Sequence, residues 1–574
     1  MNLVRRALIG LSLFLLAACA ERDPAPPAQL LVFNANILTM DAAHPRAEAM
    51  AVRDGKVVAL GTRAELESLR GESTELRDMG GRTLIPGLID AHAHPVWGAV
   101  KELFACQFAF ESTPEQVQAA IAGCVQAQPQ EQWIRGGHWT SDFFRNNRIP
   151  SPRRFLDEVS SGKAVVLQDD SGHNNWVNTR ALELLGIGKD TPDPEGVTFE
   201  READGMPNGV ILEGFKVLDG VVPDYTDAQY LAAARAAQDH ALSRGIVAFK
   251  DASASEVEAR AYQALDRSGE LHISVALSLV MDDKAAFDLP TFTRLRDTYR
   301  STHVDTRFVK LFLDGVPTAS RTAAMLQPYT VDAHHPEHTR GSLHVQPADL
   351  DRYLRELDRA GFTVKIHAAG DWSVRVALDA IAAARKANGN SGLRHEIAHA
   401  GFVDPADLPR FTALSAVADF SPYIFSPSPI IDSVVGAVGE RGLQYWPTRA
   451  LLASGAPMLL GSDWPSAVPS MDPWAGLEAL VTRRDPTGKH PGELWPEQAV
   501  DVMAALGIFT GQNAAALLLD ADLGSLAVGK RASFVVLDRD ITTVDPATLD
   551  ATRVLQTWVE GSPRFEAEPL PGPG

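Results

Sequence analysis

Short apolar segments alternate with Ala/Leu/Arg-rich helical segments through the middle of this 574-residue chain. Such alternation is typical of the βα units that build a parallel sheet. Eight of the apolar segments have strand character, which favours an α/β fold with a distorted (β/α)8 TIM-like barrel over residues 85–519. We predict the barrel strands at Thr83–Ile89, Gly245–Phe249, Leu271–Val280, Arg307–Leu313, Phe362–His367, Arg394–His399, Ala416–Phe420 and Pro457–Leu460.

The two ends of the chain carry a different, β-like pattern. Residues 30–84 contain short apolar runs broken by turn signals, among them the hairpin signal Asp54-Gly55. A similar pattern returns over residues 520–565, so we expect both ends to form one small composite β-sandwich. The first crossover, residues 95–244, is too long for a single connection and predicts an insertion that caps the barrel mouth.

Polar side chains close several of the predicted strands. His92 and His94 alternate after the first strand, so both imidazoles point to the same side of the sheet. His367, His399 and Asp463 close three later strands. The carboxyl ends of barrel strands meet at one face, where barrel enzymes carry their chemistry. Imidazoles and a carboxylate are ligands for Zn²⁺ or a similar transition metal, so the set predicts a metal site.

A lysine within the fourth predicted strand is surrounded by apolar residues. Because an unpaired buried ammonium group is costly, we expect Lys310 to form an ion pair with Asp314, to lie at a solvated edge, or to be carboxylated by CO2 and act as an anionic metal ligand. Lys250 and Lys365 also lie near strand ends, and Lys365 shares a face with His367. The spacing alone does not choose among the three lysines.

The N-terminus has the form of a secretory signal. A basic start precedes the apolar run Ala7–Ala18, which is shorter than the ~20 residues of a membrane span, and Cys19 follows it. This ending resembles the lipobox of bacterial lipoproteins. We expect a signal peptide over residues 1–18, lipidation of Cys19, a tether over residues 19–29, and export to the periplasmic side of a bacterial membrane, most simply the outer membrane. An ordinary signal peptide that contains a cysteine is the alternative.

The charge of the chain bears on which kinds of molecule it can bind. The formal net charge of −20 argues against nucleic acid, because phosphate binding needs a basic face. Cys106 and Cys124 are the remaining cysteines, and in an oxidising compartment they either pair or stay as two buried thiols.

Longer motifs surround the candidate residues along nearly the whole chain. They are Thr83–His94 (TLIPGLIDAHAH), Gly172–Asn178 (GHNNWVN), Gly205–Gly209 (GMPNG), Val309–Gly315 (VKLFLDG), His367–Asp371 (HAAGD) and Gly461–Pro465 (GSDWP). With these motifs the chain resembles the metal-dependent amidohydrolase superfamily, and within it the branch that contains N-substituted formamide deformylase. One departure is Ala398, where that branch usually has glutamate; alternation turns this position away from the barrel interior.

The resemblance implies roles for the candidate residues. One or two divalent metal ions, with zinc the leading choice, would be held by His92, His94, Lys310, His367, His399 and Asp463. Lys310 stands at the place of the carboxylated lysine that bridges the two metals, and Asp463 would also accept and return the catalytic proton. His173 would contact the substrate or, alternatively, cap a turn. Trp139 could line an apolar pocket, but we expect it to pack in the core, as a large aromatic side chain usually does.

The sequence thus predicts an enzyme, an amidohydrolase. A metal-bound hydroxide would cleave a non-peptide, amide-type C–N bond of a small organic substrate, because metal binding lowers the pKa of water towards ~7. Ester, lactone or phosphoester hydrolysis on the same site is the first alternative. A non-catalytic lipoprotein that binds a solute is the second, although every expected ligand position is filled.

Overall fold

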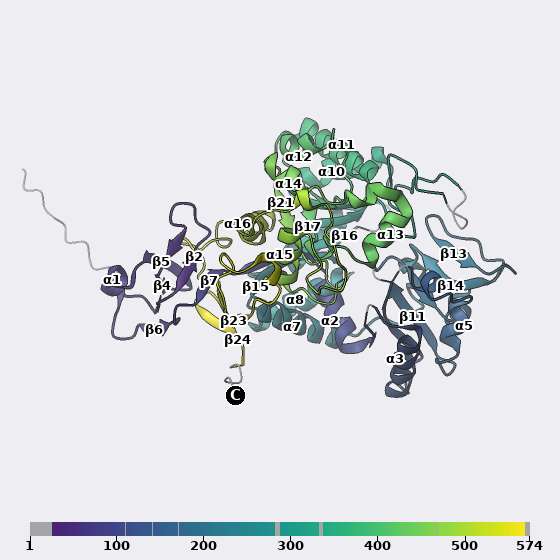
Figure 1. The fold of residues 1–574 in the computed structure, drawn as a ribbon, viewed down its shortest axis with the longest axis horizontal. Coiled ribbons are helices and arrows are strands. Elements are labelled where there is room, and N and C mark those ends of the chain that lie inside the picture. Colours follow the sequence, from purple (N-terminus) through teal and green to yellow (C-terminus); the bar gives the residue numbers. More distant parts are fainter. Residues whose placement is uncertain are drawn as a thin grey trace, which may run out of the picture.

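The computed structural model describes residues 26–568 except positions 110, 141, 170, 282–286, 332–336 and 467. The predicted signal peptide and Cys19 lie outside the described residues. In the described part, eight parallel strands form a nearly closed barrel at the centre of the molecule (Figure 1). The strands follow the order of the chain: β8 (Leu88–Ala93), β15 (Ile246–Ala254), β16 (Ser274–Val280), β17 (Val304–Phe312), β18 (Thr363–Ala368), β19 (Glu396–His399), β20 (Val417–Phe420) and β21 (Met458–Leu460). The predicted α/β class and parallel barrel are confirmed.

The side chain of Asn513 joins the first and last strands of the barrel. Its Nδ2 donates to the carbonyl oxygens of Ile89 (2.6 Å) and Leu460 (2.8 Å), and its Oδ1 accepts the N–H of Leu460 (2.9 Å). The backbone after β21 also packs closely on β8, since a Cβ at Gly461 would lie 2.3 Å from the backbone nitrogen of His92. A buried amide and a glycine therefore bring β8 and β21 together.

The first predicted strand is wrong in extent. The apolar run Thr83–Ile89 suggested one barrel strand, whereas the structure places β7 (Thr83–Pro86) in a different sheet and begins the barrel at Leu88. Pro86 has no N–H to donate. At Gly87 a Cβ would lie 2.4 Å from the side chain of Val247. The chain therefore passes from one sheet to the next across Pro86 and Gly87.

Helices cover the outside of the barrel and connect its strands (Figure 1). Their starts are encoded locally: Thr226 with Gln229, and Ser255 with Glu258, form capping boxes at two of them. Their buried faces follow helical spacing, as the leucines 350, 354 and 357 show in α10. The helices are α7 (Asp227–Ser243), α8 (Glu256–Ser268), α9 (Leu289–Tyr299), α10 (Pro347–Arg359), α11 (Asp371–Asn388), α12 (Leu408–Leu414), α14 (Thr448–Ala453), α15 (Pro473–Thr482), α16 (Val502–Gly507) and α17 (Asn513–Ala516).

Strands from both ends of the chain pair in one sheet. Its order is β24-β23-β22-β7-β2-β3, and Phe534 of β22 lies opposite Pro86 of β7. A four-stranded sheet, β5-β4-β1-β6, shares a hydrophobic core with it. The further bounds are β1 (Leu30–Phe33), β2 (Asn36–Leu38), β3 (Arg46–Ala47), β4 (Ala49–Arg53), β5 (Lys56–Gly61), α1 (Arg63–Leu66), β6 (Glu75–Asp78), β22 (Phe534–Leu537), β23 (Val554–Val559) and β24 (Ser562–Glu566).

The long first crossover contains a sheet of its own, in the order β13-β14-β12-β11-β10-β9. In Figure 1 it lies beside the barrel, at the far side from the sheets of the chain ends. Its elements are β9 (Cys106–Gln107), α3 (Pro114–Ala127), β10 (Trp133–Trp139), α4 (Phe143–Asn146), α5 (Pro152–Asp157), β11 (Ala164–Asp169), β12 (Asn175–Val177), α6 (Thr179–Leu185), β13 (Thr198–Arg201) and β14 (Pro207–Leu212), and α2 (Pro95–Phe104) leads into it.

Two open alternatives in this crossover are decided by the structure. A disulfide bond joins Cys106 of β9 to Cys124 of α3. Trp139 is buried in the core of the crossover against Phe144 and Trp176 and does not line the cavity described below. Its role is therefore packing. In the described part of the chain, every helix is too short or too polar to cross a bilayer.

Candidate metal centre and active site

The structure brings six predicted site residues together at the carboxyl end of the barrel. They are His92 and His94 of β8 and its end, Lys310 of β17, His367 of β18, His399 of β19 and Asp463 after β21. A cavity of about 400 Å³ opens onto this group and is lined by all of them except His92, which is fully buried behind the lining.

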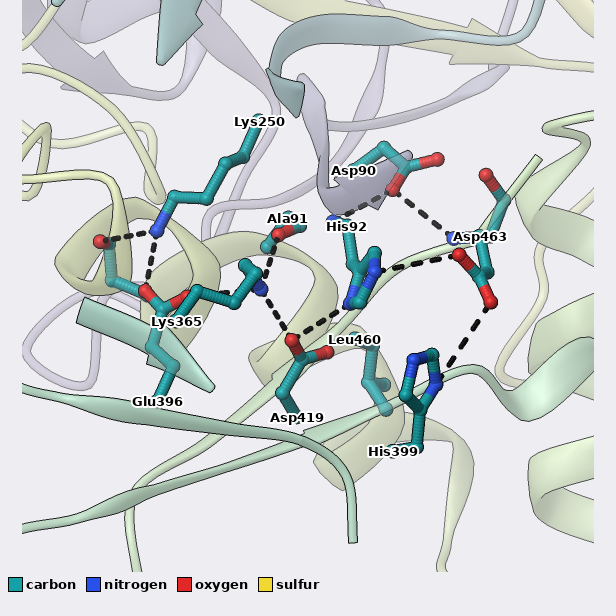
Figure 2. A network of polar contacts seen from close by, with 12 residues as sticks. Asp90, Ala91, His92, Lys250, Lys365, Glu396, His399, Asp419, Leu460 and Asp463 are labelled. Carbon is teal, nitrogen blue, oxygen red and sulfur yellow. Dashed lines mark hydrogen bonds and ion pairs between the residues drawn. The ribbon is translucent and has the colours of Figure 1, made fainter. Parts of the chain in front are cut away.

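His92, His94 and Asp463 form the tightest cluster. One ligand atom of each lies within 4.8 Å of the others. Oδ1 of Asp463 is 3.2 Å from Nε2 of His94 and 3.4 Å from Nε2 of His92. Figure 2 shows the contact between Asp463 and His92. Among the described residues, the buried Nε2 of His92 has no hydrogen-bond partner. An orphaned ring nitrogen next to a carboxylate and a second imidazole fits a divalent transition metal.

Burial sets the protonation states that a metal would need. Desolvation takes the pKa of His92 well below its usual value and also lowers that of His94. Burial raises the pKa of Asp463, but the neighbouring His92 and His94 outweigh this and lower it overall. Near neutral pH the cluster therefore offers two neutral imidazoles and one carboxylate.

His367 and His399 extend the cluster into the cavity. The ring of His399 lies 5.1 Å from that of His92 and 4.6 Å from that of His367. Nδ1 of His399 is 3.9 Å from Oδ2 of Asp463. Nε2 of His367 donates to the carbonyl oxygen of Gly315 at 3.1 Å, so its Nδ1 is the nitrogen with a free lone pair. Burial lowers the pKa of both histidines well below the usual value.

Two of the three candidate lysines are held by carboxylates. Lys250 forms an ion pair with Glu396, and Lys365 forms ion pairs with Glu396 (2.9 Å) and with Asp419 (Figure 2). Neither lysine lines the cavity. Their ammonium groups are therefore held inside the barrel, away from the cavity.

Lys310 differs from these two lysines. Within the described residues it forms no ion pair, its ammonium nitrogen lies 4.8 Å from the ring centre of Phe312, and its side chain lines the cavity. The predicted pair with Asp314 is wrong, because that carboxylate accepts the backbone N–H groups of Ala324 (2.8 Å) and Ala369 (3.0 Å) instead. Burial, together with the positive charge of Lys365, lowers the pKa of Lys310 to about 8.

The crossover contributes His173 to the cavity wall. Nδ1 of His173 lies 2.8 Å from Oε2 of Glu213, whose Oε1 accepts the hydroxyl of Thr322 at 2.7 Å. The ring of His173 is 5.2 Å from that of His367. Burial lowers the pKa of His173, but Glu213 outweighs this and raises it overall. The crossover thus presents a hydrogen-bonding imidazole beside the candidate metal ligands.

Most of the remaining cavity wall is apolar. Trp97 of α2 stands 5.7 Å from the ring of His94, and Phe312 stands 5.4 Å from that of His367. The opposite wall is built largely by α13 (Pro429–Val438) and its neighbours: Ile424, Ile430, Val434, Tyr445 and Trp446. Such a wall excludes water from a bound substrate and strengthens the electrostatic interactions inside.

Sequence reasoning missed three buried carboxylates around the site. Asp419 accepts from Nδ1 of His92 at 2.8 Å, and Glu396 lies between Lys250 and Lys365. Asp90 accepts the N–H groups of His92 and Ser462, both at 3.1 Å, and burial raises its pKa to about 7. Asp419 sits inside the apolar run Val417–Phe420, the same signal that singled out Lys310.

A parallel barrel with imidazoles and a carboxylate converging at its strand ends is the arrangement of a metal-dependent hydrolase. The chain belongs to the Amidohydrolase family, whose model matches residues 75–565. The predicted superfamily and hydrolase class are therefore confirmed.

Two curated relatives align with nearly the whole chain. LONG AFTER FAR-RED 3 of Arabidopsis thaliana is 29% identical over 551 residues, which cover 93% of this chain and 91% of the relative. N-substituted formamide deformylase of Arthrobacter pascens is 27% identical over 556 residues, covering 94% of this chain and 98% of the relative.

Solved structures show the same fold. An uncharacterized metal-dependent hydrolase from Pyrococcus horikoshii superposes with a TM-score of 0.70 at 25% identity, covering 90% of this chain and 99% of that one. Atrazine chlorohydrolase TrzN from Arthrobacter aurescens TC1, complexed with zinc, gives a TM-score of 0.51 at 14% identity, with 94% and 95% coverage. The second likeness concerns the fold alone.

Proposed function

We propose that this protein hydrolyses an amide-type, non-peptide C–N bond of a small organic substrate with one or two divalent metal ions, zinc first among them. The observation that carries the proposal is the convergence of neutral imidazoles and an ionised carboxylate on one cavity. The proposed ligands are His92, His94, Lys310, His367, His399 and Asp463. The similarity to N-substituted formamide deformylase supports the choice of an amide-type bond.

Asp463 is the proposed proton carrier. When bound, a divalent metal supplies a Lewis acid that acidifies water and polarises a carbonyl group. Asp463 lines the cavity, and its lowered pKa keeps the carboxylate ready to accept a proton from attacking water. The same Oδ atoms then return the proton to the leaving nitrogen, so that the amine departs neutral.

Lys310 is proposed to carry a carboxyl group from CO2. A free ammonium group among the imidazoles works against metal binding, because its positive charge repels a metal cation held by those histidines. A pKa of about 8 leaves part of the lysine as neutral amine near neutral pH, which is the form that reacts with CO2. Carboxylation would turn this cation into an anionic ligand.

His173 is the proposed substrate contact. Glu213 holds its Nδ1, so the other ring nitrogen is available for the substrate. This would place a polar group of the crossover opposite the barrel ligands, with the apolar wall around the remainder of the substrate.

The remaining proposals concern organisation and location. We propose a composite β-sandwich from residues 30–84 and 520–565 beside a barrel domain of residues 85–519, supported by the mixed sheet and the shared core. We also propose export and lipidation at Cys19. The disulfide between Cys106 and Cys124 supports export, because disulfides persist in oxidising compartments.

A metal-controlled substrate panel tests the proposed function. The purified protein would be stripped with a chelator, reconstituted with zinc, and assayed on N-substituted amides, esters, lactones and phosphoesters, with Asp463→Asn as the inactive control. We expect amide hydrolysis that disappears with the metal and returns with zinc. Hydrolysis confined to esters or phosphoesters would replace the proposal with the first alternative. Solute binding without turnover of any panel member would replace it with the second.

A further inference from the structure

Four charged side chains are sealed inside the barrel behind the cavity. Each of these side chains is at most 1% exposed to solvent. They belong to Lys250 of β15, Lys365 of β18, Glu396 of β19 and Asp419 of β20. Figure 2 shows them as one network that reaches His92 through Asp419. Two ammonium groups balance two carboxylates, so the network has no net charge. None of these residues belongs to the proposed ligand set.

The network reaches the metal cluster through a single oxygen atom. Oδ2 of Asp419 contacts Nζ of Lys365 and accepts from Nδ1 of His92 at 2.8 Å. Lys365 is held in turn by Glu396 at 2.9 Å and by the carbonyl oxygen of Ala91 at 3.4 Å. Lys250 completes the network on Glu396. Each charge thus has a partner on another barrel strand.

This geometry determines which nitrogen of His92 carries hydrogen. A carboxylate only accepts, so Nδ1 of His92 must donate to Asp419. Nε2 then keeps its lone pair, and this buried nitrogen has no hydrogen-bond partner among the described residues. It lies 3.4 Å from Asp463, on the side of the metal cluster.

We infer that Asp419 is a positioning residue that fixes the tautomer and ring orientation of His92 for metal binding, and that the ion pair with Lys365 holds the Asp419 carboxylate in place for this task. The Lys365 ammonium group pairs with the Asp419 carboxylate, and Glu396 with Lys250 balances the remaining charge of the network. The inference rests on the proposed function, because it takes His92 as a metal ligand.

A purely structural network would behave differently from a positioning one. If the four charges only tie the strands together, every member affects folding and none affects the metal specifically. If Asp419 acts through His92, its removal weakens metal binding beyond any change in stability. Carboxylates that orient metal-binding histidines typically contribute 10- to 100-fold in metal affinity.

The test compares Asp419→Asn with Glu396→Gln, since both replace a buried carboxylate of the network with an amide of the same shape. Zinc affinity would be measured by competition with a chromophoric chelator, and thermal unfolding would be followed with and without zinc. We expect Asp419→Asn to weaken zinc binding about 10- to 100-fold and to shrink the zinc-induced rise in Tm. Glu396→Gln should stay within about threefold of the wild-type affinity, whatever its metal-free Tm.

The outcomes separate this inference from the proposed function. Failure of the wild-type protein to bind zinc overturns both. Wild-type affinity in Asp419→Asn, or an equal loss in Glu396→Gln, overturns the inference alone. Should Asp419→Asn not fold, the Lys365→Met/Asp419→Asn variant removes the ion pair as a unit and leaves Lys250 paired with Glu396. The same loss of zinc affinity is expected from it, and unchanged affinity would contradict the inference.

Discussion

Nε2 of His94 and Oδ1 of Asp463 lie 3.2 Å apart, although 369 positions separate the two residues in the chain. They meet because β8 and β21 are the first and last strands of the barrel and its two edges come together. The candidate metal cluster therefore sits across the seam of the barrel, and its geometry depends on how the barrel closes.

The carboxylate of Asp463 is expected to be indispensable. Asp463→Asn keeps the shape but removes both a ligand charge and the proton carrier, so kcat should fall by about 10³-fold or more. Turnover and zinc content would be measured on the same sample. Asp297→Asn, at a carboxylate with 64% side-chain exposure, is the matched control. Undiminished turnover in Asp463→Asn would refute the assigned role.

Carboxylation of Lys310 should depend on pH in a definite direction. The neutral amine is the reactive form and its fraction rises as the pH rises through about 8. At a fixed concentration of dissolved CO2, stripped protein should regain activity faster at pH 9 than at pH 7. A carbamate signal after labelling with ¹³C-bicarbonate should be lost in Lys310→Ala and kept in Lys56→Ala, an exposed lysine. Persistence of the signal in Lys310→Ala would place the group elsewhere.

His173 should affect the substrate and spare the metal. His173→Ala removes the polar group that Glu213 presents to the cavity, so kcat/KM should fall about 10- to 100-fold, the effect of one hydrogen bond to a charged group. Glu213→Gln should give a smaller loss, because the imidazole remains. Zinc content, measured in parallel, should match the wild type. A loss of zinc in His173→Ala would instead make His173 a ligand.

Asn513 should stabilise the closed barrel. Asn513→Ala leaves the carbonyl oxygens of Ile89 and Leu460 and the N–H of Leu460 without partners, and we expect a loss of about 3 kcal/mol in the free energy of unfolding. Denaturant unfolding measures the change, with Asn390→Ala at an exposed position as the control. Equal stability of the two variants would show that β8 and β21 close without this amide.

Asp358 should make the free energy of unfolding decrease as the pH falls into the acid range. Burial raises its pKa, but hydrogen bonds from His395 (3.0 Å), Ser391 (2.5 Å) and Asn388 (2.8 Å) outweigh this and lower it overall. The folded state then binds fewer protons than the unfolded state, so the stabilisation is complete above the unfolded pKa of about 4 and is lost as the pH falls further. Urea unfolding at pH 7 and pH 3.5 should show a smaller acid-induced loss in Asp358→Asn than in wild type. Parallel losses in the two proteins would contradict this.

The sequence predicted the candidate metal ligands where the alternation of a β-strand and the residue type point to the same site. Alternation within a strand placed His92 and His94 on one side of the sheet. His367, His399 and Asp463 were predicted from their positions at strand ends, because the parallel strands of a barrel share one carboxyl face. The same reasoning could not choose among Lys250, Lys310 and Lys365, since the partners that separate them, Glu396 and Asp419, lie on other strands.

Two other features of the structure could not be predicted from the local sequence pattern. The run Thr83–Ile89 is uniformly apolar, and the switch between sheets at Pro86 and Gly87 depends on the close approach of Val247. The pairing of His173 with Glu213 spans 40 positions and depends on how the crossover folds. Such contacts are set by tertiary structure, which a single sequence does not display.

The antiparallel pairing of β7 with β22 has a consequence for how the protein is made. Phe534 meets Pro86 across about 450 residues of intervening chain. At a ribosomal rate of roughly 5–20 residues per second, the N-terminal strands wait on the order of half a minute or more for their partners to emerge. During that interval β7 has an open edge that invites pairing with other chains. β7 therefore gains this neighbour only after nearly the whole chain has been made.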